Sequence, residues 1–119
     1  MAKVIDLAYE FGVKVIKLCQ ELPKNSVGFA ISGQLVRSAT SIGANIEEAQ
    51  DAMSRADFLK CMNIALKEAR ETKYWLRIIV GAKLTAVTRI DSYSNEADEL
   101  VKMLTRIVKT TKERMGKSN

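Results

Sequence analysis

Apolar residues recur at spacings of three and four along most of the chain, and this period constrains the fold more than any other feature. Residues three and four apart lie on one face of an α-helix, so each uninterrupted run predicts one amphipathic helix. Four helical segments are predicted, over residues 4–21, 27–52 and 54–81 and from about 88 onward. The stripes expected to face the core are Val4, Leu7, Ala8, Phe11, Val15, Leu18 and Leu22; Ile31, Leu35, Ala39, Ile42, Ile46, Ala49 and Met53; Phe58, Met62, Ala65, Ala69, Thr72, Leu76 and Ile79; and Ile90, Tyr93, Ala97, Leu100, Leu104, Ile107, Thr111 and Met115.

The breaks between these segments carry residues that start and stop helices. Pro23 disfavours α geometry in the residue before it and is expected to end the first helix. Ser54 is placed to cap the third helix, and Asp57 three residues later completes a capping-box pattern. Gly81 is a suitable stop for that helix. Gly43 lies inside the second segment, where it predicts either a close approach of a neighbouring backbone or a bend.

Short connections between helices of similar length predict an antiparallel up-down-up-down four-helix bundle. The chain of 119 residues is therefore expected to form one all-α domain spanning residues 1–119. No stretch reaches the roughly 18 uncharged apolar residues that a membrane span needs, and the N-terminus is too charged for a signal peptide. A cytoplasmic location without membrane contact is predicted.

Two of the predicted helices carry a second apolar side. Ile5 and Ile16 lie about 100° around the first helix from its stripe, and Trp75 and Ile78 flank the stripe of the third. A helix with two apolar sides is either central or buries its second side against another chain, and no helix is central in a four-helix bundle. We therefore predict a homo-oligomer that uses these four residues. A broad core face with Trp75 at its edge is the alternative.

The chain contains no histidine, which removes the commonest general base and the commonest metal ligand of proteins. Catalysis by a Ser–His or Cys–His pair is therefore excluded, and the chain has neither a Gly-rich phosphate loop nor a CxxC pair. Cys19 and Cys61 lie in apolar helical stretches and are expected to be buried free thiols. We predict no enzymatic activity, cofactor, metal or small-molecule substrate.

Two polar features leave alternatives open. A carboxylate metal site is the least favoured functional hypothesis, and its candidate ligands are Glu47, Glu48, Glu68 and Glu71. Asn45 sits beside the apolar stripe of the second helix, where its amide needs hydrogen-bonding partners. If the second and third helices are antiparallel, Glu48 and Glu71 can supply them. We predict that Asn45, Glu48 and Glu71 form a structural polar clamp; a functional site is the alternative.

Basic residues are distributed unevenly along the chain, whose net charge is +5. Lys102, Arg106 and Lys109 share the face of the fourth helix opposite its apolar stripe. The helix dipole favours cations near a C-terminus and could explain this gradient without a ligand. The alternative is a surface that contacts the phosphates of RNA or DNA. A smaller cluster in the third helix consists of Arg70, Lys73 and Arg77. No aromatic residue is expected among these cations, so base stacking is not predicted.

A family resemblance lies in the run from Gln34 to Ile79, QLVRSATSIGANIEEAQDAMSRADFLKCMNIALKEARETKYWLRII. It resembles the bacterial four-helix bundle proteins first named for open reading frames in intervening sequences of large-subunit ribosomal RNA. Many members have proline where this chain has Gly43, so the same bend is expected there. The motifs that carry the resemblance are Arg37-Ser38, Ser41-Ile42-x-Ala44-Asn45-Ile46-x-Glu48-Ala49, Asp57-Phe58 and Ile64-Ala65-Leu66-Lys67-Glu68-Ala69-x-Glu71-Thr72-x-Tyr74-Trp75-Leu76.

The resemblance implies an up-down bundle that assembles into a barrel-shaped pentamer and has no known enzymatic activity. A relative, the accessory variability determinant of diversity-generating retroelements, is similar in fold and works with a reverse transcriptase and nucleic acid through a basic surface. The ribosomal name reflects gene location and does not imply membership of the ribosome. The first functional hypothesis is a homo-oligomeric scaffold that binds RNA or DNA weakly. The second is a protein-interaction module that does not bind nucleic acid.

Overall fold

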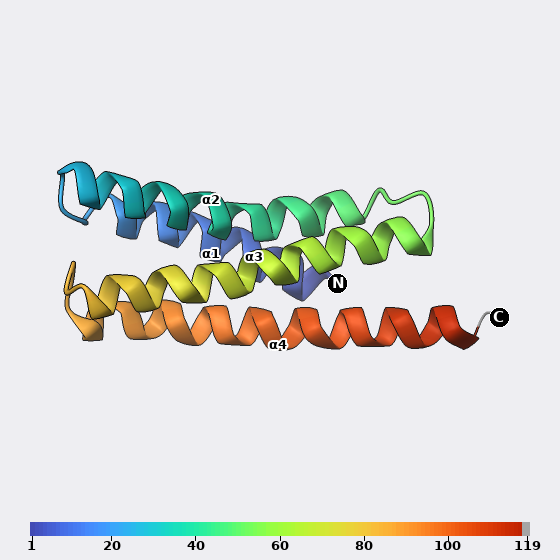
Figure 1. The fold of residues 1–119 in the computed structure, drawn as a ribbon. Coiled ribbons are helices and arrows are strands. Elements are labelled where there is room, and N and C mark those ends of the chain that lie inside the picture. The colour runs from blue at the N-terminus through green and yellow to red at the C-terminus, as the bar shows by residue number, and fades with distance from the viewer. Residues whose placement is uncertain (118–119) are drawn as a thin grey trace.

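The computed structural model describes residues 1–117. In that range four helices run alternately up and down beside one another (Figure 1). The predicted all-α antiparallel four-helix bundle is confirmed. Residues 118–119, which the single-domain prediction included, lie outside the described part, and that assignment stays a prediction. The helices are α1 (Ala2–Cys19), α2 (Ser26–Ala49), α3 (Arg55–Gly81) and α4 (Val87–Lys117).

The helix ends are set by local hydrogen bonds. The Ser54 side chain accepts a bond from the Asp57 amide at 3.1 Å, which confirms the predicted cap of α3. Asn25 caps α2 in the same way through the Gly28 amide at 2.8 Å, a cap that was not predicted. A side chain at Gly28 would collide with the carbonyl oxygen of Pro23, since its Cβ would lie 1.8 Å away. Glycine there lets the α1–α2 connection fold tightly against the first turn of α2.

The left-handed residue that ends α3 is Lys83 and not a glycine. Gly81 is the last helical residue, as predicted, but Lys83 adopts the left-handed conformation with φ 57°. The Leu84 amide bonds to the Ile79 carbonyl at 3.0 Å and the Lys83 amide to the Val80 carbonyl at 3.1 Å. These two bonds form a Schellman motif that satisfies the last carbonyls of the helix.

The core follows the predicted stripes closely. Every predicted stripe residue is buried or half-buried, with the single exception of Met53, whose side chain is 92% exposed. The reason is that α2 ends at Ala49, so the residues after it no longer follow the helical period. At Gly43 the α1 backbone passes alongside α2, but a Cβ there would lie 3.7 Å from Ala8 of α1, so the approach does not require a glycine. This is an ordinary van der Waals distance, and α2 continues as a helix through Gly43.

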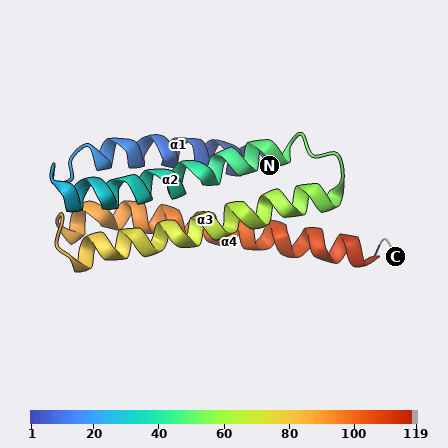
Figure 2. The ribbon, with the colours of Figure 1, turned by 45° about the horizontal axis from the view of Figure 1, so that its top comes forward.

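The bundle is elongated and uneven at one end. Its principal extents are 53 × 21 × 21 Å. The N-terminus of α1 stops short of the end at which α3 begins and α4 finishes, in both views (Figures 1 and 2). α1 packs mainly on α2 and only slightly on α4, whereas α3 packs extensively on both α2 and α4. No helix in the described range has the length and apolar content for crossing a membrane.

Candidate nucleic-acid interface

A polar network joins α2 to α3 at the middle of the bundle. Arg37 of α2 forms ion pairs with Glu68, at 3.1 Å, and with Glu71. Ser38 follows Arg37 on α2, and Thr72 follows Glu71 on α3. The hydroxyl groups of Ser38 and Thr72 are hydrogen-bonded at 2.9 Å, and both residues are fully buried. We call these five residues the Arg37 network. A buried hydroxyl pair requires both partners to stay in register, so the network fixes how α3 lies against α2.

The Arg37 network continues to the aromatic pair of α3. The Trp75 indole Nε1 donates to Glu71 Oε2 at 3.3 Å. The rings of Tyr74 and Trp75 are 5.2 Å apart and inclined by 72°, an edge-to-face arrangement. Trp75 is half-buried, whereas the Tyr74 side chain is 51% exposed. The exposed Tyr74 ring is therefore oriented by its contact with Trp75, which is hydrogen-bonded to Glu71 of the Arg37 network.

The three residues of the predicted polar clamp have other partners. Asn45 Nδ2 donates to the Ser41 carbonyl of its own helix at 2.8 Å, a local bond that polar side chains commonly make inside helices. Glu71 is held by Arg37 and Trp75, and Glu48 is exposed. Among residues 1–117 no hydrogen bond joins Asn45, Glu48 and Glu71 to one another. The polar contact between α2 and α3 is made instead by the Arg37 network.

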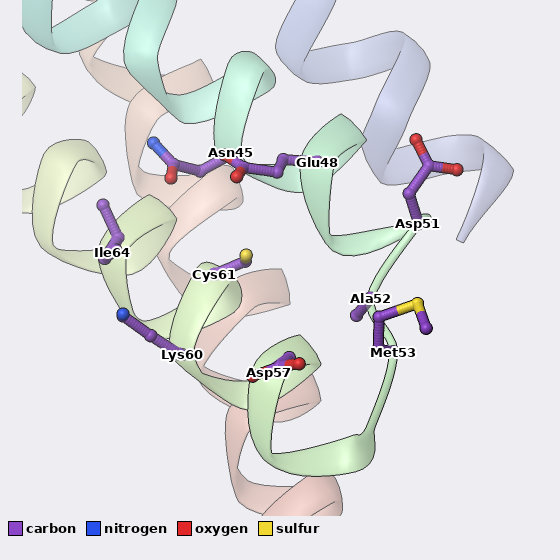
Figure 3. Close-up of a pocket in the computed structure, with 9 residues that line it drawn as sticks. All are labelled: Asn45, Glu48, Asp51, Ala52, Met53, Asp57, Lys60, Cys61 and Ile64. Carbon is purple, nitrogen blue, oxygen red and sulfur yellow. The ribbon is translucent and has the colours of Figure 1, made fainter.

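A depression with a volume of about 520 Å³ lies between the end of α2 and the start of α3. Figure 3 shows Asn45 and Glu48 on its α2 side and Lys60, Cys61 and Ile64 on its α3 side. Asp51, Asp57 and the exposed Met53 complete its open rim. No group of histidine, cysteine, aspartate or glutamate residues within the described range is arranged to hold a metal ion.

The four glutamates of the carboxylate-metal hypothesis are dispersed. Glu68 and Glu71 pair with Arg37, Glu48 lines the depression of Figure 3, and Glu47 lines a groove between α1 and α2. They do not converge on one point, so the structure gives that hypothesis no support.

The structure brings the cations of the third helix together. Arg70, Lys73 and Arg77 line one open depression of about 370 Å³ between α3 and α4, with Tyr74 and Val101. We call these three residues the α3 basic cluster. Tyr74 lies among them, which contradicts the prediction that no exposed aromatic residue would be found there. Arg70, Tyr74 and Arg77 are four and three residues apart and so share one helix face; this spacing could have revealed the arrangement.

The charge of the α3 basic cluster is partly balanced by α4. Lys73 Nζ lies 2.7 Å from Asp98 Oδ1. Arg70 and Arg77 are exposed, and within residues 1–117 neither takes part in an ion pair. Arg70 and Arg77 can therefore bind an anionic ligand without breaking an ion pair, whereas Lys73 would have to give up its pair with Asp98.

The predicted cations of α4 divide between two places. Lys102, Arg106 and Lys109 are all exposed. Lys102 follows Val101, which lines the depression of the α3 basic cluster. Arg106 lines a different depression, with Met1, Phe58 and Ile107. Arg106 therefore lies apart from the α3 basic cluster, and none of the three α4 cations lines the depression of that cluster.

The predicted oligomer residues also fall in different surroundings. Ile5 and Trp75 are half-buried and pack against the core, and Ile78 is half-buried. Ile16 is 41% exposed and lines the α1–α2 groove of about 300 Å³. Tyr9 and Val13 of α1 are exposed in the same groove, although the sequence reasoning did not select them.

The two cysteines are free and half-buried, and so less deeply buried than predicted. Burial raises the pKa of the Cys19 thiol, while a hydrogen bond with the Ser32 side chain acts in the opposite direction. A raised pKa keeps this thiol protonated and weakly nucleophilic at neutral pH.

Comparison with known proteins decides the family. The model of the 23S rRNA-intervening sequence protein family matches residues 2–106. The chain belongs to this family. The chain is also similar to a solved structure from Bacteroides thetaiotaomicron, described as a protein with unknown function from the S23 ribosomal protein family. Its crystal structure is similar with a TM-score of 0.84 and 43% sequence identity, over 89% of this chain and 98% of that chain. No curated protein matches this family member.

Membership gives meaning to the motif residues. Arg37-Ser38 and the run from Glu68 to Thr72 carried the resemblance in sequence, and they form the two sides of the Arg37 network. The motif therefore encodes the contact between α2 and α3. Tyr74 and Trp75, which end the motif, are attached to that contact through Glu71.

Proposed function

We propose that this family member is a non-enzymatic scaffold that binds nucleic acid through the outer face of α3 and the adjoining part of α4. The observation that supports the proposal is the gathering of Arg70, Lys73 and Arg77 around one open depression. The exposed Lys102 follows Val101, the residue of α4 that lines the same depression. Arginine guanidinium groups bind phosphate oxygens in a bidentate manner and remain charged at all physiological pH values. Two arginines without carboxylate partners thus favour a polyanion over an uncharged ligand.

The test is the salt dependence of binding to a labelled RNA of random sequence. Each neutralised phosphate should contribute about −0.7 to the slope of log K against log salt for a single strand, and about −0.9 for a DNA duplex. A variant with Arg70→Glu, Arg77→Glu and Lys102→Glu should lose binding. Lys73 is left unchanged because of its ion pair with Asp98.

A matched control reverses three other exposed lysines, Lys3, Lys17 and Lys24. They lie on α1 and the loop after it, and in the described part of the chain α1 is not a neighbour of α3 but packs on α2 and α4. The control has the same change in net charge as the test variant, so it should weaken binding only through the overall field of the protein. Equal losses in the two variants would reject the proposed face. Absence of RNA and DNA binding by the unchanged protein at low salt would reject the function and favour a protein-interaction module.

We further propose that the protein acts as a cytoplasmic homo-oligomer, with the pentamer that the family resemblance implies. Support comes from Tyr9, Val13 and Ile16, which leave a row of exposed apolar side chains in the α1–α2 groove. Light scattering at micromolar concentration should give a mass above the 13.2 kDa of one chain, and Ile16→Asp should lower it. A monomeric mass for the unchanged protein would reject this part of the proposal.

A further inference from the structure

Tyr74 is the feature of the α3 basic cluster that phosphate binding alone does not explain. Its side chain is 51% exposed and lines the depression together with Arg70, Lys73 and Arg77. Exposed aromatic rings are costly to hydrate and are common where nucleobases stack. An aromatic ring among cations can bind both parts of a nucleotide. The base can stack on the ring, and the phosphate can contact the guanidinium groups.

The Tyr74 ring is oriented before any ligand arrives. It packs edge-to-face with Trp75, whose centroid is 5.2 Å away. Trp75 is bonded to Glu71, and Glu71 is paired with Arg37 of the neighbouring helix. A side chain that is already held loses less conformational entropy on binding than a free one. This chain of contacts therefore favours a recognition role for the ring over a coincidental exposure.

The flanking arginines are placed on the same face as the ring. Arg70 precedes Tyr74 by four residues and Arg77 follows it by three, so the two arginines flank the tyrosine along one face of α3. One turn of α-helix rises about 5.4 Å, so the seven-residue step from Arg70 to Arg77 spans about two turns. A single strand that runs along α3 could thus place phosphates at both arginines and a base at the tyrosine.

We infer that Tyr74 is a stacking platform for an unpaired nucleobase of a single-stranded RNA or DNA, with Arg70 and Arg77 binding the adjacent phosphates. The inference rests on the proposed nucleic-acid binding and specifies its ligand. A duplex keeps its bases stacked inside, so a tyrosine at the surface of the bundle cannot reach their flat surfaces. Binding through Tyr74 is therefore selective for single strands.

The experiment measures fluorescence anisotropy of four labelled probes: a short oligo(U) RNA, the equivalent oligo(dT), the oligo(U) length with abasic sugars, and a duplex RNA. Tyr74→Ala should weaken binding of oligo(U) and oligo(dT) by about tenfold and leave the duplex and the abasic strand unchanged. Tyr74→Phe should bind like the unchanged protein, since it keeps the ring, and Tyr74→Leu should bind like Tyr74→Ala.

Phe29→Ala is the matched control, since it removes an aromatic side chain that is 63% exposed at the start of α2, outside the cluster. It should leave the affinity for every probe unchanged. The chain has one tryptophan, Trp75, in contact with the Tyr74 ring. Its emission should change when oligo(U) binds and should not change with the abasic strand, a readout that a purely structural role of Tyr74 would not produce.

The outcomes separate the inference from the function on which it rests. Equal losses on oligo(U) and on its abasic counterpart would overturn stacking while leaving phosphate binding intact. The same conclusion follows if Tyr74→Ala has no effect on any probe that the protein binds. Failure of the unchanged protein to bind any of the four probes would overturn both. Displacement of oligo(U) by an acidic peptide of equal charge, at equal concentration, would also overturn the inference.

Discussion

The two sides of the bundle are held together differently. Between α2 and α3 the contact includes the Ser38–Thr72 hydroxyl pair, which is fully buried, and the ion pairs of Arg37. On the other side, Lys14 of α1 pairs with Glu96 of α4 at 2.9 Å, and Glu21 in the connection after α1 pairs with Arg89 of α4. Three of these four side chains are more than two-fifths exposed. Exposed ion pairs contribute little to stability, while a buried polar pair is costly to break.

This difference has a consequence for function. The α2–α3 contact fixes the register of the helix that carries Tyr74 and the α3 basic cluster. The α1–α4 contact is small and sits on the opposite side, where α1 leaves apolar side chains in its groove with α2. We therefore expect the binding face to be the rigid part of the molecule and α1 to be the part that adapts, for example on assembly.

The largest expected effect is a cavity in the rigid half. Leu76→Ala removes a side chain of α3 that is 1% exposed, which should lower the free energy of unfolding by about 2–5 kcal/mol. Leu18→Ala, which removes a fully buried side chain of α1, should cost less, because α1 packs only slightly on α4. Urea denaturation measures both. Equal costs would show that α1 is as tightly packed as α3 and would remove the contrast between the two sides.

A smaller effect is expected from the buried hydroxyl pair. Thr72→Val deletes the hydrogen bond to Ser38 and should cost about 1 kcal/mol. Thr111→Val is the control, because the hydroxyl of Thr111 bonds to the Ile107 carbonyl of its own helix. A double-mutant cycle with Ser38→Ala should give a coupling energy between Ser38 and Thr72. A coupling energy of zero would mean that the pair does not fix the α2–α3 register.

The smallest effect is expected at the α1–α4 ion pair. The hydrogen bond and charge of Glu96 raise the pKa of Lys14 above its ordinary value of 10.5. The folded protein thus holds this proton more tightly than the unfolded chain, so the contribution is complete below the ordinary value and disappears as the pH rises through the raised value. Lys14→Met should leave the denaturation midpoint at pH 7 nearly unchanged. A large loss at pH 7 would show that this exposed pair holds the bundle together.

Much of the fold was predictable, because apolar spacing determines which face of each helix is buried. The apolar stripes of all four helices were predicted correctly except at Met53, because the end of α2 was predicted too late in the chain. The candidate site was harder to predict. Arg70, Lys73 and Arg77 were selected from charge alone, but the exposure of Tyr74 depends on how α3 rotates against α2 and α4.

The polar contact was predicted at the wrong residues for a similar reason. Asn45 was paired with glutamates because a half-buried amide needs a partner, yet its own helix supplies one at Ser41. Local hydrogen bonds of this kind leave no mark in the spacing of apolar residues. Arg37, in contrast, was known only as part of a motif, and its two glutamate partners emerge from the packing of α2 on α3.

The most direct test of the account is backbone NMR of the ¹⁵N-labelled protein titrated with oligo(U). The account predicts amide shift changes in α3 over residues 70–77 and in α4 over residues 98–102, and none in α1. Shift changes confined to the α1–α2 groove, or their absence at low salt, would contradict the claim that the α3 basic cluster and Tyr74 form a nucleic-acid-binding face.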